Sequence, residues 1–388
     1  MIVFPGKCNE QPSLRRIQEA IGKEMPLDNV VVCTDAGLAG GQNRVMNSSN
    51  GRSFICTHSL ARSKKYVREW ALKQDGFVDA GGVPRTPESL LEEWRGADAE
   101  KRKKLYGVVL SKSRSINDPI EGFDDDGNAL SYPIEQTLVV TFSVKYWLLQ
   151  RETFDEELEM ARKVVSGERE CEGAKKDKGF RRLLTETAVT KDGEVAERTY
   201  SLNEERAADE SALFGYYCQA TNMDEKPAYI LSVVKMRWQV EYDFRTMKSD
   251  LSGPIFHWND KRIVGHLELV CLALNALKAI QYKMYEAAGF QAFAIGKIPD
   301  DFKKAKREPS RLGPWDLTSH SIQAALASME GTRINAKVAG TDIPVELVAS
   351  SAKRSPISDA LSDYIGINPS RKYYETKQFE RIAKCDKL

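Results

Sequence analysis

The chain has 388 residues, of which 41% are hydrophobic and 29% are charged. This composition is typical of a soluble globular protein, and the length is enough for two or three domains. No run of 18 or more apolar residues occurs, so we expect no membrane-spanning helix. The 57 lysine and arginine residues nearly balance the 56 aspartate and glutamate residues, so any contact with nucleic acid has to come from a local basic patch.

The seven cysteines are widely spaced, with no Cys-x-x-Cys pair and no cluster of cysteine and histidine, so we expect no structural zinc site. Cys33, Cys56 and Cys218 lie within apolar or aromatic runs, which is typical of reduced, buried thiols in a cytoplasmic protein. The N-terminal sequence has no basic start and only a short apolar run. We therefore expect no signal peptide and predict a cytoplasmic location.

The opening of the chain has the pattern of an α/β fold. Residues 13–21 have apolar side chains at helical spacing, and residues 30–33 form an unbroken apolar run. Such a run predicts a strand that is buried on both faces at the centre of a sheet. Residues 53–59 predict a second buried strand after a short connection, so residues 1–61 are assigned to the first part of an α/β domain.

Residues 62–228 predict a large β-rich insertion into this domain. Near its start, a helix is expected for which Thr86 is the N-cap. Strands and hairpins are expected around residues 122–130, 137–147, 190–202 and 214–222.

After residue 228 we expect a return to helices. Residues 229–290 complete the α/β domain, and residues 260–285 within them predict a long, largely buried helix. Residues 291–388 predict a helical or irregular C-terminal extension, most of which has no clear apolar pattern.

The helix predicted at residues 237–251 carries two stripes at about 3.6 residues per turn. The apolar stripe consists of Val240, Phe244, Met247 and Leu251. The charged stripe beside it consists of Arg237, Glu241, Arg245 and Lys248. One carboxylate among three cations can hold a divalent metal ion while the cations bind phosphates. The same pattern also fits a solvated helix edge with an i,i+4 ion pair, and spacing alone does not separate the two interpretations.

Asp35 follows the first predicted strand and opens a glycine-rich turn. A carboxylate at this place can line a cleft at the carboxyl end of the sheet, or it can simply cap the turn. Together with Glu241 it would supply two of the acids that a two-metal phosphoryl-transfer site uses.

The segments "VVVCTDAGL" and "RWQVEYDFRTMKSDL", followed by "GPIFHWNDKRIVGHLELVCLAL", resemble bacterial insertion-sequence transposases of the DDE type, in the insertion-sequence-four group. "FPGKCNE" and "YSLNEERAADESALFGYYCQATN" are also similar to this family. The match touches most of residues 1–290. Its most specific part is the spacing Arg-x3-Glu-x6-Lys at Arg237, Glu241 and Lys248.

The resemblance implies an RNase H-like catalytic core with a β-rich insertion, and a metal-dependent activity that cleaves and transfers DNA strands. Asp35 matches the second acid of the catalytic triad and Glu241 the third. Arg237 and Lys248 match basic residues that would hold DNA phosphates near the cleaved end, and Arg245 lies on the same stripe.

The cofactor that the resemblance implies is Mg²⁺. The implied partners are the DNA ends of the element, the target DNA and a second copy of the chain in the DNA complex, with no membrane partner. Within the bacterial cytoplasm, the protein would associate with the nucleoid when it binds DNA.

The sequence departs from the family pattern at three places. Val234 stands where the helix motif begins with tyrosine, and residues 214–217 stand where similar sequences often have Asp-Gly. The first catalytic aspartate belongs to an opening strand upstream of "FPG", whereas this chain begins at Met1 with "MIVFPG". We therefore expect the opening strands to be missing. An alternative hypothesis follows, in which the chain is a truncated, catalytically incompetent relative that binds DNA or a full-length partner.

Other patterns give weaker candidates. "DDDGN" at residues 124–128 is interpreted as a hairpin turn rather than a calcium loop. His257 and His266 are interpreted as packing or hydrogen-bonding residues. Trp238 either packs in the core or stacks on a base. The basic run at residues 303–311 either contacts the DNA backbone or is a solvated loop.

Overall fold

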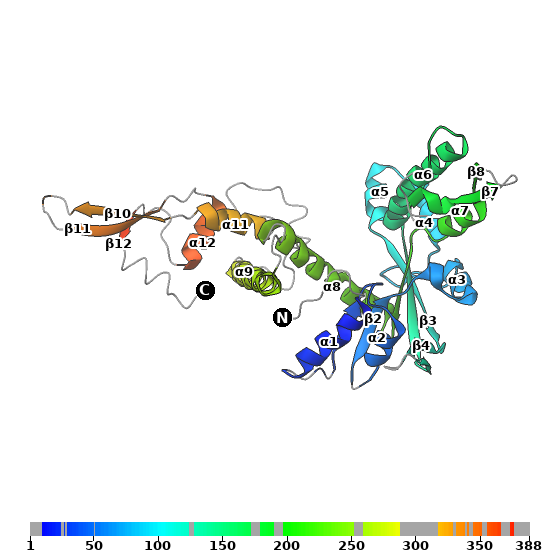
Figure 1. The fold of residues 1–388 in the computed structure, drawn as a ribbon, viewed down its shortest axis with the longest axis horizontal. Coiled ribbons are helices and arrows are strands. Elements are labelled where there is room, and N and C mark those ends of the chain that lie inside the picture. Colours follow the sequence, from blue (N-terminus) through cyan, green and yellow to red (C-terminus); the bar gives the residue numbers. More distant parts are fainter. Residues whose placement is uncertain are drawn as a thin grey trace. The chain divides into compact units, whose positions relative to one another are not determined.

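The fold is that of a computed structural model, which describes residues 10–24, 27, 29–49, 51–123, 128–171, 179–189, 197–251, 259–287, 317–328, 331–337, 340, 344–350, 355–365 and 373–375. The described residues form a mixed α/β protein, which confirms the predicted fold class at this level (Figure 1). The chain divides into two compact units, residues 2–235 and residues 236–388, which meet within one helix.

The first unit is organised around a five-stranded sheet with the strand order β1–β2–β9–β6–β3. Its strands are β1 (Val31–Thr34), β2 (Ser53–Thr57), β9 (Tyr216–Thr221), β6 (Gln136–Ser143) and β3 (Val109–Ile116). β1 pairs with β2 in parallel, and the other neighbouring strands are antiparallel. The strands expected around residues 30–33, 53–59, 137–147 and 214–222 are present as β1, β2, β6 and β9, although residues 144–147 are helical instead.

The prediction that the first strand lies at the centre of the sheet was wrong. Among the described strands β1 is at one edge, and Val31 to Cys33 are only half-buried. Val31 and Cys33 pack against a small apolar cluster around Ile55, which covers one face of the strand. A four-residue apolar run is compatible with either position, because a short edge strand can be covered by a helix as fully as a central one.

The segment predicted as a β-rich insertion adds β9, β6 and β3 to this same sheet, and it also contains helices. The helices of the first unit are α1 (Gln11–Gly22), α2 (Gly41–Met46), α3 (Lys65–Leu72), α4 (Pro87–Gly96), α5 (Ala99–Tyr106), α6 (Val144–Val165) and α7 (Glu204–Ser211), with 3₁₀ turns η1 (Leu60–Arg62) and η2 (Gly179–Leu183). Two predicted hairpins are present as β4 (Ile120–Phe123) with β5 (Ala129–Tyr132) and β7 (Leu184–Val189) with β8 (Glu197–Leu202). Residues 124–127 and 190–196, which include the predicted turns, lie outside the described residues.

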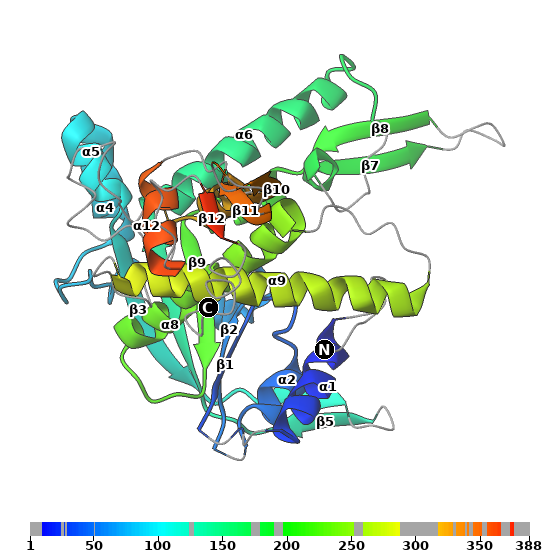
Figure 2. The same ribbon diagram turned by 90° about the vertical axis from the view of Figure 1, so that its left-hand side faces the viewer.

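Alternating side chains give the sheet two apolar faces. On one face, residues such as Phe54, Leu138 and Ala220 form the main core with apolar residues of α3, α4, α5 and α6. On the other face, Ile55 and Val139 bury Ile230 of helix α8 (Pro227–Arg245). A third cluster joins α6 to η2, β8 and α7, and the hairpin β7–β8 lies beside α6 (Figure 2).

Local polar contacts explain where two of these helices begin and end. The Thr86 side chain accepts a hydrogen bond from the Ser89 amide in a capping box at the start of α4, which confirms the predicted N-cap. The buried Lys112 ammonium donates to the carbonyl oxygens of Trp70 and Lys73 at 2.7 and 2.6 Å, and so satisfies the end of α3. Burial lowers the pKa of Lys112 to about 8.

The second unit contains helices and a small sheet. After α8 come a π-helix η3 (Thr246–Leu251), α9 (Asp260–Ala287), α11 (Ser319–Ser328) and α12 (Pro356–Ile365). Strands β10 (Gly331–Lys337), β11 (Pro344–Ser350) and β12 (Tyr373–Glu375) form an antiparallel sheet, which the sequence analysis missed. The apolar core of this unit joins α9, α11 and α12 around Tyr285, Ile322 and Leu361.

The prediction that α9 is largely buried was wrong. Only 11% of its most apolar 18-residue window is buried, and Leu269 and Leu272 are 68% and 64% exposed. The mean hydropathy of that window is 1.7, so by length and composition α9 meets the criterion for a membrane span. An unbroken apolar run is not needed for this, because a few polar residues are tolerated in such a helix. A single helix of this kind also occurs in soluble proteins, so it does not decide the location.

Candidate active site

Asp35 lies directly after β1, at the carboxyl end of the parallel pair formed by β1 and β2. The side chain is exposed, and its Oδ1 atom accepts a hydrogen bond from the Leu38 amide at 3.1 Å. This bond closes a turn, which is the structural role that the sequence also allowed. The turn leaves the Asp35 carboxylate at the surface, at the edge of the sheet where ligands commonly bind in α/β proteins.

A second carboxylate, that of Glu10, faces the same turn. A side-chain carbon at Gly37 would lie 3.2 Å from Asp35 Oδ1 and 3.4 Å from Glu10 Oε2. The two carboxylate oxygens are therefore no farther apart than the sum of these distances. Glu10 is the N-cap residue of α1, but its side chain makes no capping hydrogen bond. Glu10 was not among the site residues predicted from the sequence.

The first turn of α1 is held against this loop by Gln11. Its Oε1 atom accepts a hydrogen bond from the Gly40 amide at 3.0 Å, and Asn43 of α2 donates to the Gln11 carbonyl at 3.1 Å. A side-chain carbon at Gly40 would lie 2.3 Å from Gln11 Oε1, so a larger residue there would displace the Gln11 side chain. The same contact joins the start of α1, where Glu10 lies, to the loop after Asp35.

Beside this loop, His58 follows β2 and lies between two polar partners. Its Nδ1 atom is 3.4 Å from Arg44 Nη2, and its Nε2 atom is 2.9 Å from Ser63 Oγ. Because arginine can only donate, Nδ1 accepts, and Nε2–H then donates to Ser63, whose hydroxyl donates to the Ser59 carbonyl. Burial, and to a smaller extent the Arg44 charge, lower the pKa of His58 to about 4, so this network contains a neutral imidazole.

The thiols near β2 are inert. Cys56 and Cys218 are buried, and burial raises the pKa of both thiols above the ordinary value. Cys33 is half-buried. The prediction of buried thiols is therefore confirmed for Cys56 and Cys218 but not for Cys33.

The charged stripe of the predicted helix lies on α8 and η3. Arg237 Nη2 is 3.9 Å from Glu241 Oε1, and the Glu241 side chain is 73% exposed. A solvent-exposed pair at this distance contributes little to stability. Arg245 is exposed at the end of α8, and Lys248 is exposed within η3, with its ammonium 6.0 Å from the Phe244 ring. The structure thus leaves the Glu241 carboxylate accessible to a ligand.

The spacing of about 3.6 residues per turn assumed for the two stripes applies only as far as Arg245, where the α-helix ends. The π-helix η3 follows, in which hydrogen bonds join each residue to the fifth along, so Met247, Lys248 and Leu251 are rotated relative to an α-helix. Short π-helical segments are frequent at functional sites and have no simple sequence signal.

The apolar stripe next to this edge is largely exposed. Val240 and Phe244 are 55% and 54% exposed, whereas Leu251 packs against the core of the second unit. Trp238 is half-buried, and its ring lies 6.3 Å from that of Tyr242. This contact favours packing as its role.

The remaining sequence candidates contribute nothing to a described site. His257, most of "DDDGN" and the basic run at residues 303–311 lie outside the described residues. Within the part of the chain that the structure describes, no group of three or more histidine, cysteine, aspartate or glutamate residues is arranged to hold a metal ion. The pair of Glu10 and Asp35 lies in the first unit, and Glu241 belongs to the second.

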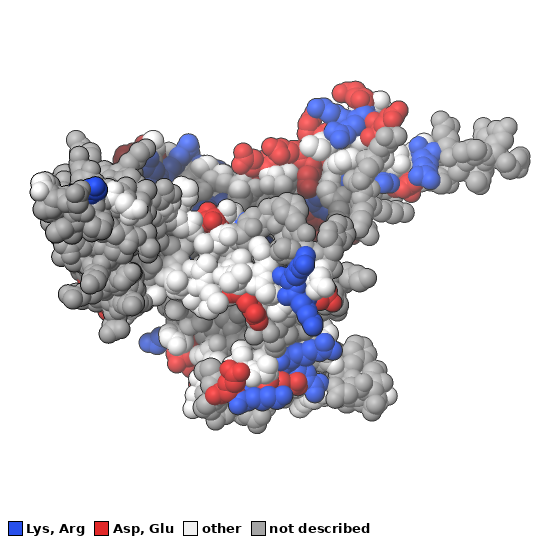
Figure 3. Space-filling view, turned by 60° about the vertical axis from the view of Figure 1, so that its left-hand side comes forward, with Lys and Arg blue, Asp and Glu red and all other residues white. Residues whose placement is uncertain are grey.

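Basic and acidic side chains lie close together on one face of the described residues. On the face drawn in Figure 3, blue and red residues lie next to one another instead of forming one large basic region. The mixture on this face agrees with the balanced composition.

Comparison of the chain with protein-family models and with curated protein sequences found no match. The interpretation of the site therefore rests on its residues and their arrangement.

We predict that the neutral His58 makes folding sensitive to mild acid. Because the pKa of His58 is about 4 in the folded protein and about 6.5 in the unfolded chain, the unfolded state binds a proton first as the pH falls. Stability is therefore lost between about pH 6.5 and pH 4, by on the order of 3 kcal/mol. Urea unfolding across this range should show the loss in the wild type.

In His58→Gln, this part of the pH dependence should be absent, because glutamine can accept from Arg44 and donate to Ser63 without titrating. His320→Gln, at an exposed position of α11, is the matched control and should keep the wild-type pH dependence. An unchanged slope in His58→Gln would contradict the assignment of a buried neutral imidazole.

Proposed function

We propose that the protein is a DNA transposase of the DDE type, which cleaves DNA strands and transfers them to target DNA with the help of Mg²⁺. The observation that carries this proposal is the position of Asp35 at the carboxyl end of the parallel strands β1 and β2, with the Glu10 carboxylate facing the same turn. Hard divalent cations prefer carboxylate oxygens, and exposed acids at this edge of a sheet suit phosphoryl transfer.

We further propose that residues 10–61 and α8 belong to an RNase H-like core. Support comes from the order helix, strand, helix, strand in α1, β1, α2 and β2, and from the parallel pairing of the two strands. The segment between β2 and α8 extends the sheet on the far side of β2, away from Asp35. An insertion on that side of β2 leaves the parallel pair β1–β2, and Asp35 at its carboxyl end, unchanged.

In this proposal, Asp35 and Glu241 are the residues that would hold Mg²⁺, and the bound ion would activate water or a DNA 3′-hydroxyl for attack on a phosphodiester. The donor set fits a hard cation, because both carboxylates are exposed and the ion pair of Glu241 with Arg237 is long. Glu10 would be a further carboxylate beside Asp35 that helps to concentrate the cation.

Arg237, Arg245 and Lys248 would bind DNA phosphates along the edge of α8 and η3. This stripe has three cations and one carboxylate, that of Glu241. A DNA phosphate can therefore compete with Glu241 for Arg237, because the ion pair between these two residues is long. The proposed partners are the ends of a DNA element, its target DNA and a second copy of the chain within the DNA complex. The proposed location is the bacterial cytoplasm.

We predict that Asp35→Asn and Glu241→Gln each lower Mg²⁺-dependent strand cleavage by more than ~100-fold, since each removes a proposed metal ligand. Glu10→Gln should have a smaller effect, about 10-fold. Cleavage of a labelled supercoiled plasmid is the measurement, with binding of labelled duplex DNA measured in parallel and expected to stay within about twofold of the wild type.

Glu19→Gln on α1 and Asp250→Asn in η3 are matched controls, because both acids are exposed and lie outside the proposed site. Full cleavage by Asp35→Asn or Glu241→Gln would remove that residue from the site. A wild-type protein that binds DNA but never cleaves it would instead favour the binding-only relative.

We predict that Arg237→Ala, Arg245→Ala and Lys248→Ala weaken the binding of duplex DNA. Each should also lower the slope of log affinity against log salt by about 0.9, because one phosphate contact fewer releases one counterion fewer. Lys283→Ala on α9 removes a comparably exposed cation that pairs with Glu286, and should leave the slope unchanged. Slopes equal to that of the wild type in all four variants would show that the charged stripe of α8 and η3 does not contact DNA phosphates.

A further inference from the structure

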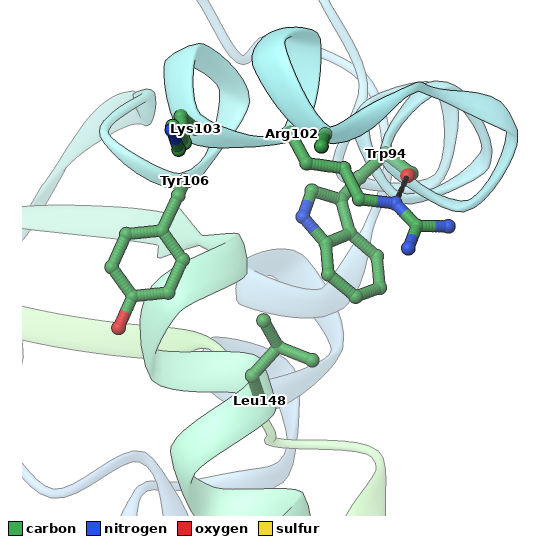
Figure 4. Close-up of a pocket in the computed structure, with 6 residues that line it drawn as sticks. Trp94, Arg102, Lys103, Tyr106 and Leu148 are labelled. Carbon is green, nitrogen blue, oxygen red and sulfur yellow. Dashed lines mark hydrogen bonds between the residues drawn. The ribbon is translucent and has the colours of Figure 1, made fainter.

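A pocket of about 490 Å³ lies where α4, α5 and α6 meet, away from the loop that carries Asp35. Figure 4 shows the Trp94 and Tyr106 rings extending toward α6 on either side of the Leu148 side chain. Ala99, Arg102 and Lys103 complete the lining. The pocket therefore has two aromatic walls, an aliphatic floor and cations at its rim.

The local sequence holds this pocket in shape. Asp98 caps α5 by accepting from the Lys101 amide at 2.8 Å. Arg102 donates to the Trp94 and Arg95 carbonyls at 3.1 and 2.8 Å, and its guanidinium lies 4.9 Å from the centre of the Trp94 ring. The angle between α4 and α5 and the position of the Trp94 ring are thus set before any ligand binds.

Exposed cations surround the pocket. Lys103 pairs with Glu100 at 3.7 Å, but both side chains are about 80% exposed, so this ion pair is weak. The Lys145 ammonium lies 5.9 Å from the centre of the Tyr106 ring, at the start of α6. Lys101 is paired with Glu93 at 2.9 Å and is therefore less available. Lys103 and Lys145 remain as the cations that can contact an anion next to the aromatic walls.

We propose that this pocket binds single-stranded DNA. One base stacks against Tyr106 and the edge of Trp94 above Leu148, and the neighbouring phosphates contact Lys103 and Lys145. The ligand needs a flat apolar face beside a negative charge, and an unpaired nucleotide has both. In a duplex, each base face is already covered by its neighbours, so a duplex can use the lysines but not the aromatic walls. The choice of DNA over RNA rests on the proposed function.

Binding of the full-length protein to a labelled oligothymidine, in buffer with EDTA, tests this proposal. Tyr106→Ala should weaken binding about tenfold, because stacking of one base contributes on the order of 1–3 kcal/mol. Tyr106→Phe, which keeps the ring, should bind like the wild type. Tyr146→Ala is the matched control, since Tyr146 is a comparably exposed tyrosine on α6 that stacks on Tyr217 instead.

The rim lysines are tested by salt dependence. Lys103→Gln and Lys145→Gln should each lower the salt slope for the oligothymidine by about 0.7. Lys163→Gln, about 27 Å farther along α6 by helix rise, should not change it. Unchanged slopes in the first two variants would overturn the phosphate contacts.

Several outcomes would overturn the pocket itself. One is an equal loss of oligothymidine binding in Tyr106→Ala and Tyr106→Phe. Another is a loss of duplex binding in Tyr106→Ala as large as its loss of oligothymidine binding. The third is tighter binding of oligouridine than of oligothymidine. Oligothymidine binding does not depend on the proposed catalytic residues, so Asp35→Asn should bind the oligothymidine normally. A failure of the proposed function can therefore be told apart from a failure of the pocket. Metal-dependent cleavage by a protein that does not bind oligothymidine would overturn the pocket alone.

Discussion

The burial of Ile230 against Ile55 and Val139 is the contact on which the candidate site depends. Ile230 is fully buried and holds the first half of α8 against one face of the sheet, opposite the main core. Within the second unit, the rest of the helix contacts other partners: Tyr242 donates to Ser319 at 3.2 Å, and Asp243 pairs with Lys278 at 2.6 Å. One helix therefore serves the core of the first unit and carries the charged residues of the second.

The parallel pair β1–β2 is the second constraint. It brings Asp35 and His58, which follow different strands, to the same edge of the sheet. The polar groups at this place have different roles. Arg44 and His58 form a closed network that supports the loop, whereas Asp35 and Glu10 face the surface. Under the proposed function, the exposed carboxylates of Asp35 and Glu10 would be available to a metal ion, and the network of Arg44 and His58 would support the loop.

Much of the local structure could be predicted because its cause is local. The N-cap Thr86 is identified by its position before Pro87, and β2 is identified by a short apolar run. The position of β1 at the edge could not be predicted, because an apolar strand looks alike at an edge and at a centre. For the same kind of reason, the exposure of α9 was missed, since its composition fits a buried helix as well as an exposed one.

The parts of the site that were missed depend on contacts between distant residues. Glu10 lies at the turn of Asp35 through contacts such as the hydrogen bond between Gln11 and Gly40, which are 29 positions apart in the chain. The π-helix after Arg245 changes the direction of Lys248, and nothing in the spacing of the charged stripe indicates it. The three-stranded sheet of the second unit was missed because its first strand has a single large apolar residue, Ile334.

Under the proposed function, Asp35 and Glu241 both bind Mg²⁺. Iron-mediated cleavage of the polypeptide tests it directly: Fe²⁺ replaces Mg²⁺ in the full-length protein, and the oxygen radicals formed with ascorbate cut the backbone only near the bound ion. We expect cuts close to residue 35 and close to residue 241, both suppressed by excess Mg²⁺, with the cuts near residue 35 lost in Asp35→Asn and those near residue 241 lost in Glu241→Gln. Cuts near only one of these residues would remove the other from the proposed metal ligands, and cuts that excess Mg²⁺ does not suppress would contradict Mg²⁺ binding at both.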